Sequence, residues 1–113
     1  MKNREIWLIN LDPTIGSEIK KTRPAVIVSH NDIGILPLKI IVSITDWKAH
    51  YSHAPWMIKL MPDKQNALQK ISSADTFQVR SIAQERFIKQ IGVVDEVTMQ
   101  LIKHGLQCVL DIN

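Results

Sequence analysis

Arg23 is the residue whose chemical type and position most clearly suggest a binding or catalytic role in this 113-residue chain. It stands next to Pro24, where a loop broken by Pro13 and Gly16 ends and the apolar run 25–29 begins. A guanidinium group can bind a phosphate through two parallel hydrogen bonds, and it stays charged at physiological pH. A long basic side chain can equally be a surface cation whose methylene groups cover apolar neighbours. The residue types alone leave both interpretations open.

Thr45 is a second candidate, because it ends a stretch, 38–45, whose residues alternate between the two faces of an extended strand. We expect one face to be core, and its residues are Leu38, Ile40, Val42 and Ile44. The other face carries Lys39, Ile41, Ser43 and Thr45. This second face could carry chemistry at its end, although a Thr there is often explained by β-propensity alone.

The sequence offers few ligands for a metal ion. Its four histidines, at positions 30, 50, 53 and 104, and the single Cys108 do not form a close ligand set. His50 and His53 could attract an ion weakly, but a zinc site needs three or four protein ligands. Glycine-rich phosphate-binding loops are also missing from the sequence. We therefore expect no metal ion and no cofactor.

Length and composition predict one globular domain over residues 1–113, with 45% hydrophobic and 22% charged residues. A formal net charge of +3 permits a nucleic-acid partner without requiring one. We expect no signal peptide, because charged residues precede the first apolar run, and no membrane span. The single cysteine cannot form an internal disulfide, which suits a cytoplasmic location.

Hydrophobic patterning predicts a mainly β protein. The expected strands are 5–11, 24–29, 38–45, 56–60, 70–75 and, from a weaker pattern, 86–93. One helix is expected after Asp95, a good N-cap residue, with the apolar stripe Val97, Leu101, Ile102, Leu106, Val109 and Leu110. Gly105 should destabilise this helix by about 1 kcal/mol relative to Ala, so packing against the strands must hold it. The order of elements predicts a small β-barrel or curled sheet with a C-terminal helix.

Three segments together carry a family resemblance. They are the first loop with Asp12-Pro13, Gly16-Ser17-Glu18 and Arg23-Pro24, then the strand 41–45, then Gln78-Val79-Arg80-Ser81-Ile82. In this order they resemble the MazF/PemK (Kid) family of toxin endoribonucleases from type II toxin-antitoxin systems. The resemblance spans nearly the whole chain, and it implies an SH3-like barrel with added helices.

The resemblance also implies roles for individual residues. Arg23 matches the arginine at the scissile phosphate, and Thr45 matches the threonine that donates a hydrogen bond beside it. Gln78 and Arg80 match a Gln-x-Arg segment that lines the RNA groove. Ser17, Glu18 and Lys21 belong to the first loop, which would shape that groove. Trp47 follows Thr45 and could stack on an unpaired base, or it could fold back over the barrel.

The chain departs from the family pattern at two positions. Many relatives carry a carboxylate immediately before the glutamine, where this chain has Phe77. Asp75 lies two residues earlier, on the same face of an extended strand, and is the first candidate for the general base. His50 and His53 are alternatives, because the ordinary pKa of histidine suits proton transfer near neutrality. The other departure is Arg4, where relatives usually have glycine.

The expected function is a cytoplasmic ribonuclease toxin that cuts single-stranded mRNA within a short sequence. The family's route needs no metal, because the 2′-hydroxyl of the RNA is the nucleophile. The resemblance also implies a homodimer and an antitoxin whose acidic, disordered tail occupies the groove. Two alternatives stay open: a non-catalytic toxin that binds a protein such as DNA gyrase, and an SH3-like binding module without toxicity.

Overall fold

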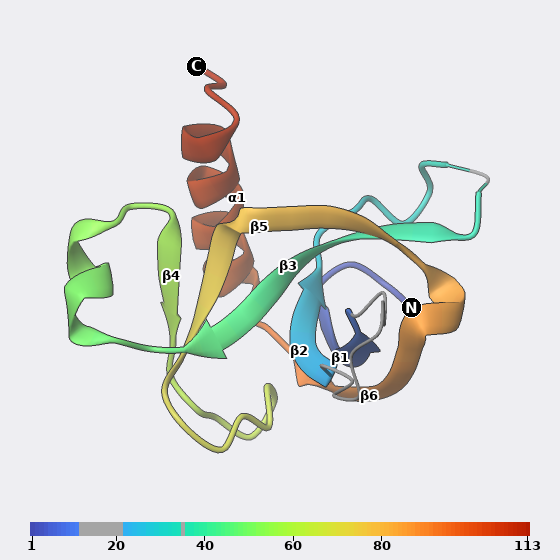
Figure 1. The fold of residues 1–113 in the computed structure, drawn as a ribbon, viewed down its shortest axis with the longest axis horizontal. Helices are drawn as coiled ribbons and strands as arrows, with labels where there is room; N and C mark the ends of the chain where they lie inside the picture. Colours follow the sequence, from blue (N-terminus) through green and yellow to red (C-terminus); the bar gives the residue numbers. More distant parts are fainter. Residues whose placement is uncertain (12–21, 35) are drawn as a thin grey trace, which may run out of the picture.

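One antiparallel six-stranded sheet and one C-terminal helix make up the fold (Figure 1). The computed structural model describes residues 1–11, 22–34 and 36–113. The strands are β1 (Glu5–Asn10), β2 (Thr22–Ile27), β3 (Leu38–Asp46), β4 (Met57–Leu60), β5 (Ser72–Ala83) and β6 (Phe87–Val93). They are ordered β4-β5-β3-β2-β1-β6. The short 3₁₀ helices η1 (Ala49–His53) and η2 (Gln84–Arg86) precede β4 and β6, and α1 (Glu96–Val109) ends the fold.

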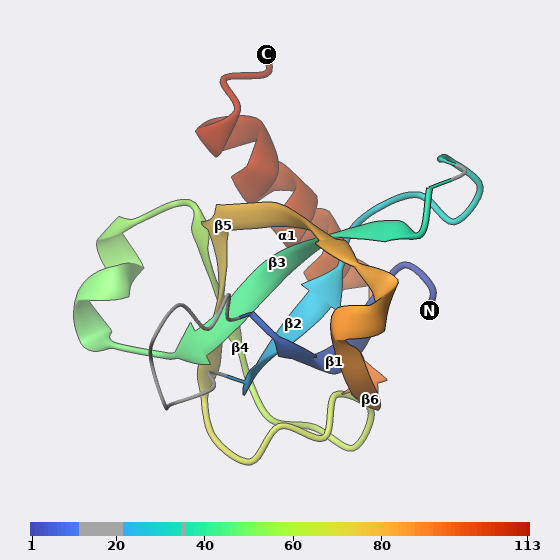
Figure 2. The same cartoon turned by 45° about the vertical axis from the view of Figure 1, so that its right-hand side comes forward.

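The sheet is strongly curled. β5 arches across the molecule and continues through η2 into β6, at the opposite edge of the sheet (Figure 2). Helix α1 packs against β4 and β5. The mainly β architecture with one C-terminal helix, predicted from the sequence, is confirmed. No helix within the described ranges is both long and apolar enough to cross a membrane.

The sheet has buried side chains on both faces, and they form two separate clusters. The larger cluster includes Val42 and Ile44 of β3 together with Met99 and Ile102 of α1. The smaller one includes Ile41, which the alternation places on the opposite face. The predicted core face of β3 is therefore only partly correct. Leu38 and Ile40 share the face of Val42 but are 42% and 43% exposed, whereas Ile41 is completely buried.

The predicted strands agree closely with the observed ones, except for the fifth. The predicted 70–75 is the beginning of β5, which runs on to Ala83 and includes the Gln-x-Arg segment. Between the pairs Val42↔Val79 and Ser43↔Asp75 the register shifts, because β5 has extra residues there. This β-bulge interrupts the alternation that would reveal a long strand in the sequence.

Helix α1 begins where its cap was predicted. Asp95 Oδ1 accepts a hydrogen bond from the Thr98 N–H at 2.7 Å. The buried residues of α1 are Met99, Ile102 and Gly105. The predicted apolar stripe was wrong in part, because Val97, Leu101 and Leu110 are 71%, 50% and 55% exposed and Met99 was not included.

The close contact between α1 and β5 explains why position 105 of the helix is a glycine. A Cβ there would lie 2.9 Å from Cγ2 of Thr76 on β5, closer than real Cβ atoms come. Thr76 is itself held by a hydrogen bond of 2.7 Å from its Oγ1 to the carbonyl oxygen of Trp56. The glycine therefore lets α1 approach the sheet closely.

The connection between β4 and β5 is fixed by side-chain hydrogen bonds. Asp63 Oδ1 accepts from the N–H groups of Gln65 and Asn66, at 2.9 and 2.7 Å. The carbonyl oxygen of Gln65 accepts from Val93 N–H, and a Cβ on Gly92 would lie 2.5 Å from that same oxygen. The connection is thereby held against β6, and it positions residues 67–70.

Candidate functional site

A cleft of about 1120 Å³ lies at one end of the curled sheet. Its walls come from β2, β3, β5, β6, η1 and the β4–β5 connection. The described lining residues are Leu11, Thr22, Arg23, Pro24, Ile44, Thr45, Asp46, Lys48, Tyr51, Ala67, Leu68, Gln69, Lys70, Ser72, Gln78, Arg80, Lys89 and Ile91. Four of the residues singled out in the sequence meet here: Arg23, Thr45, Gln78 and Arg80.

Strand register explains why Arg23 and Thr45 come together. The β2–β3 ladder ends with the pair Ala25↔Ser43. Continued by two residues along both strands, this register would place Arg23 opposite Thr45, and both residues line the cleft. On its other side, Arg23 pairs with the fully buried Ile9 of β1. A cation and a hydroxyl thus line the same cleft, where β2 begins and β3 ends.

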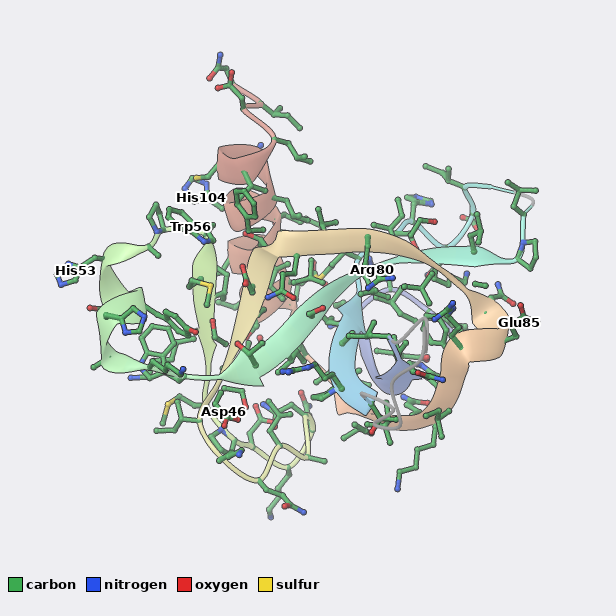
Figure 3. The ribbon with its side chains drawn as sticks, in the orientation of Figure 1. Asp46, His53, Trp56, Arg80, Glu85 and His104 are labelled. Atoms are coloured by element: carbon green, nitrogen blue, oxygen red, sulfur yellow. The ribbon has the colours of Figure 1, made fainter. Side chains whose placement is uncertain are left out.

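Gln78 and Arg80 reach the cleft from β5. Arg80 pairs with Ile41 of β3, and Figure 3 shows it along the arch of β5. Gln78 lies within the bulge, where its Nε2 donates to Asp75 Oδ2 at 2.8 Å. The other oxygen, Asp75 Oδ1, accepts from Phe77 N–H at 3.1 Å. Asp75 is not among the lining residues, and it contacts the cleft through Gln78.

Three lysines in the cleft were not predicted from the sequence. Lys48 follows Trp47, Lys70 comes from the β4–β5 connection, and Lys89 comes from β6. With Arg23 and Arg80 they make the described lining strongly cationic, and its one carboxylate, Asp46, is paired with Lys70 at 3.1 Å. Lys48 could have been suspected because it lies so close to Thr45. No sequence pattern points to Lys70 or Lys89, because the sheet topology alone brings them to the cleft.

The Thr45 hydroxyl has an unusual environment. Its Oγ1 is shielded from water and has no hydrogen-bond partner among the described residues. The same is true of Ser73 Oγ, and Ser73 lies directly opposite Thr45 in the β3–β5 ladder. Within the described part of the chain, the Thr45 hydroxyl therefore donates to no other group, and Thr45 lines a cationic cleft.

The aromatic and histidine candidates lie to one side of the cleft. Trp47 is partly buried, its ring meets Tyr51 edge-on at 5.7 Å between centroids, and Lys59 Nζ lies 5.2 Å from its centroid. His50 and His53 belong to η1, and neither lines the cleft. Figure 3 shows His53 at the outer edge of the molecule, away from Arg80.

Three predicted binding residues, Ser17, Glu18 and Lys21, lie outside the described residues. A metal centre is not evident in the described part of the chain, where no three His, Cys, Asp or Glu side chains are grouped to share an ion.

Comparisons with known proteins agree with the family resemblance in the sequence. A family profile described as "PemK-like, MazF-like toxin of type II toxin-antitoxin system" matches residues 2–110. A relative from Mycobacterium tuberculosis named Endoribonuclease MazF9 is 29% identical over 115 residues, which cover 99% of this chain and 98% of the relative.

Solved structures share the same fold. A mycobacterial endoribonuclease in complex with its cognate antitoxin matches with a TM-score of 0.79 and 16% identity, over 100% of this chain and 97% of the other. A MazE-MazF structure from Deinococcus radiodurans matches with a TM-score of 0.78 and 17% identity, over the same shares of the two chains.

Proposed function

Because the chain belongs to the PemK-like, MazF-like toxin family of type II toxin-antitoxin systems, we propose that it is a metal-independent endoribonuclease that cleaves single-stranded mRNA. The observation that carries the proposal is the single cleft shared by Arg23, Thr45, Gln78 and Arg80. Its five cationic side chains, from Arg23, Lys48, Lys70, Arg80 and Lys89, suit a polyanion such as RNA.

The proposed reaction uses the RNA itself as the nucleophile. The 2′-hydroxyl on the 5′ side of the scissile bond attacks the adjacent phosphorus, forming the O2′–P bond and breaking the P–O5′ bond. Solvent takes the proton from the 2′-oxygen and supplies a proton to the departing 5′-oxygen. The products are a 2′,3′-cyclic phosphate and a free 5′-hydroxyl. Because the substrate supplies the nucleophile, no metal-bound water has to be generated.

Arg23 is assigned to the charge of the transition state. Negative charge grows on the phosphate oxygens as the 2′-oxygen attacks, and a guanidinium binds two such oxygens at once. The pKa of an arginine side chain is too high for ready proton exchange, so its role is electrostatic stabilisation. Thr45, opposite it in the continued register, is assigned to donate a hydrogen bond to the same phosphate.

Gln78 and Arg80 are assigned to substrate binding along the wall formed by β5. The bond from Gln78 Nε2 to Asp75 Oδ2 fixes the direction of the Gln78 amide. We assign Asp75 to orient Gln78 instead of taking the proton, because Asp75 is hydrogen-bonded to Gln78 and does not line the cleft. Trp47 stays a proposed stacking surface for an unpaired base at the rim.

A cognate antitoxin with an acidic segment is the proposed regulatory partner, because such a segment would compete with RNA for the same cations. We also propose a cytoplasmic homodimer. Its support is the apolar surface that the described residues leave exposed, including Leu38 and Ile40 on β3 and Val97 and Leu101 on α1.

The test is cleavage of a long single-stranded transcript by the purified protein in excess EDTA, with the ends mapped by primer extension. A short oligoribonucleotide carrying the mapped sequence is then prepared with and without a 2′-deoxy sugar on the 5′ side of the scissile bond. We expect cleavage of the all-ribose form only. Cleavage of the deoxy form would refute the internal nucleophile, and an intact transcript would favour a non-catalytic toxin.

A further inference from the structure

Ser73 is a fully buried residue of β5 that no sequence pattern identified and that does not line the cleft. The β3–β5 ladder is regular from Ser43↔Asp75 to Asp46↔Ser72, and within it Ser73 lies directly opposite Thr45. Directly opposite residues of an antiparallel pair point to the same face, with Cβ atoms about 4.5–5.5 Å apart. A serine and a threonine hydroxyl at that separation can reach each other by rotation about χ1.

The Thr45 and Ser73 hydroxyls share an unusual environment. Neither Thr45 Oγ1 nor Ser73 Oγ has a hydrogen-bond partner within the described ranges, although both atoms are shielded from water. A buried hydroxyl without a partner makes the folded state less stable than an apolar side chain of similar shape would. Among the described residues, then, no contact makes serine more stable than alanine at position 73.

On the β4 side of Ser73, the neighbouring residue is Lys59, whose side chain contacts a different group. Lys59 of β4 pairs with Ser73 in the β4–β5 ladder. Its ammonium group lies over the Trp47 ring, 5.2 Å from the centroid. Across the strands, Thr45 is therefore the hydroxyl partner that the register offers to Ser73.

We propose that Ser73 is a positioning residue for Thr45, and this inference rests on the proposed ribonuclease function. When a phosphate enters the cleft, the shielded Thr45 hydroxyl turns toward it by rotation about χ1, and the Ser73 hydroxyl donates to Thr45 Oγ1. That bond occupies a lone pair of Thr45 and directs its own proton toward the phosphate. Hydrogen bonds in such a chain polarise and strengthen one another. Ser73 acts only through Thr45, because Ser73 has no exposed surface with which to touch the RNA.

The test is a double-mutant cycle on the full chain, with the mapped oligoribonucleotide as substrate. We expect Ser73→Ala to lower kcat about tenfold, the effect of one lost hydrogen bond, and to change KM by less than about twofold. Its melting temperature should equal or exceed that of the wild type, because an unsatisfied hydroxyl has been removed. The variant Thr45→Ala should lose more activity, and Thr45→Ala with Ser73→Ala should be no slower than Thr45→Ala alone.

Thr76→Val is the matched control. Thr76 is also a fully buried hydroxyl residue of β5, but its hydrogen bond to the Trp56 carbonyl is formed. We expect Thr76→Val to lower the melting temperature and leave kcat unchanged. The inference is overturned if Ser73→Ala keeps the wild-type kcat, or if its effect multiplies with that of Thr45→Ala. A wild-type protein that leaves RNA intact would overturn the proposed function and this inference together.

Discussion

Ser73 and Thr76 lie three residues apart on β5 and are both completely buried, yet their hydroxyls are in opposite states. Thr76 Oγ1 donates to the Trp56 carbonyl oxygen, and its methyl group faces Gly105 of α1. Ser73 Oγ has no partner in the described part of the chain, and the residue opposite it, Thr45, borders the cleft. Within β5, therefore, the buried hydroxyl near α1 is hydrogen-bonded, whereas the buried hydroxyl opposite the cleft residue Thr45 has no partner among the described residues.

The difference separates what the fold needs from what the site needs. Near α1, the Thr76 hydroxyl is hydrogen-bonded and Gly105 leaves no room for a Cβ, so changes there should affect stability first. At the cleft, two hydroxyls without a partner among the described residues, and five cations with one carboxylate in the lining, weaken the fold unless a ligand satisfies them. Departures from good packing and pairing are typical of functional sites.

Among changes to cleft residues, Arg23→Ala should lower the cleavage rate most. Loss of a fixed charge at the transition state should lower the cleavage rate about 100-fold or more, by analogy with loss of an oxyanion donor. The melting temperature should stay close to that of the wild type, because the Arg23 side chain is exposed. Initial rates on the mapped oligoribonucleotide measure the first effect, and thermal unfolding measures the second.

Lys103→Ala is the control for this experiment, because Lys103 is an exposed cation on α1 that does not line the cleft. It should cleave at the wild-type rate. A folded Arg23→Ala protein with normal activity would show that the reaction takes place elsewhere.

Asp75→Asn should have the next largest effect, about tenfold on the rate, because it weakens the hydrogen bond that orients Gln78. If Asp75 only orients Gln78, the acidic limb of the pH–rate profile should remain. Disappearance of that limb, together with a much steeper loss, would instead identify Asp75 as the general base. His50→Ala and His53→Ala serve as comparisons, and both should stay active because neither residue lines the cleft.

The fold was largely predictable, because its strands and helix depend on local patterns. Five of the six strands and the Asp95 cap lie where hydrophobic runs and a capping residue place them. The exception, β5, was predicted too short because its bulge breaks the alternation. The buried face of α1 was predicted less well, because Val97 and Leu101 are exposed. The spacing of apolar residues did not reveal that α1 contacts β5 through Gly105.

The candidate site was predictable in part. Residue type and position made Arg23 and Thr45 candidates, the resemblance gave them roles and added Gln78 and Arg80, and all four line one cleft. Lys89 enters the cleft because β6 pairs with β1, and Lys70 enters it because the connection between β4 and β5 is fixed against β6. Ser73 required the β3–β5 register itself. Pairings between distant segments are the information that a single sequence lacks.

Gly105→Ala should have a smaller effect, limited to stability. Alanine favours a helix by about 1 kcal/mol over glycine, but the added methyl would lie 2.9 Å from Thr76 Cγ2. Overpacking of this kind typically destabilises by about 1–3 kcal/mol, so we expect a net destabilisation of about 1 kcal/mol in urea unfolding. The cleavage rate should not change. A Gly105→Ala protein more stable than the wild type would show that α1 lies farther from Thr76 than the 2.9 Å contact implies.

The smallest effect concerns pH and the Asp95 cap at the start of α1. Hydrogen bonds from the Thr98 side chain and from its N–H lower the pKa of Asp95 below its ordinary value of 3.8. A carboxyl whose pKa is lower in the folded state stabilises the fold above its unfolded pKa, and this contribution is lost as the pH falls through the folded pKa. The melting temperature should therefore decrease on acidification below about pH 4, partly because of this residue. In Asp95→Asn, which keeps a capping side chain without the titration, that decrease should be smaller, and cleavage at neutral pH should be unchanged. An Asp95→Asn protein whose melting temperature falls with acid as steeply as that of the wild type would assign the acid sensitivity to other carboxylates.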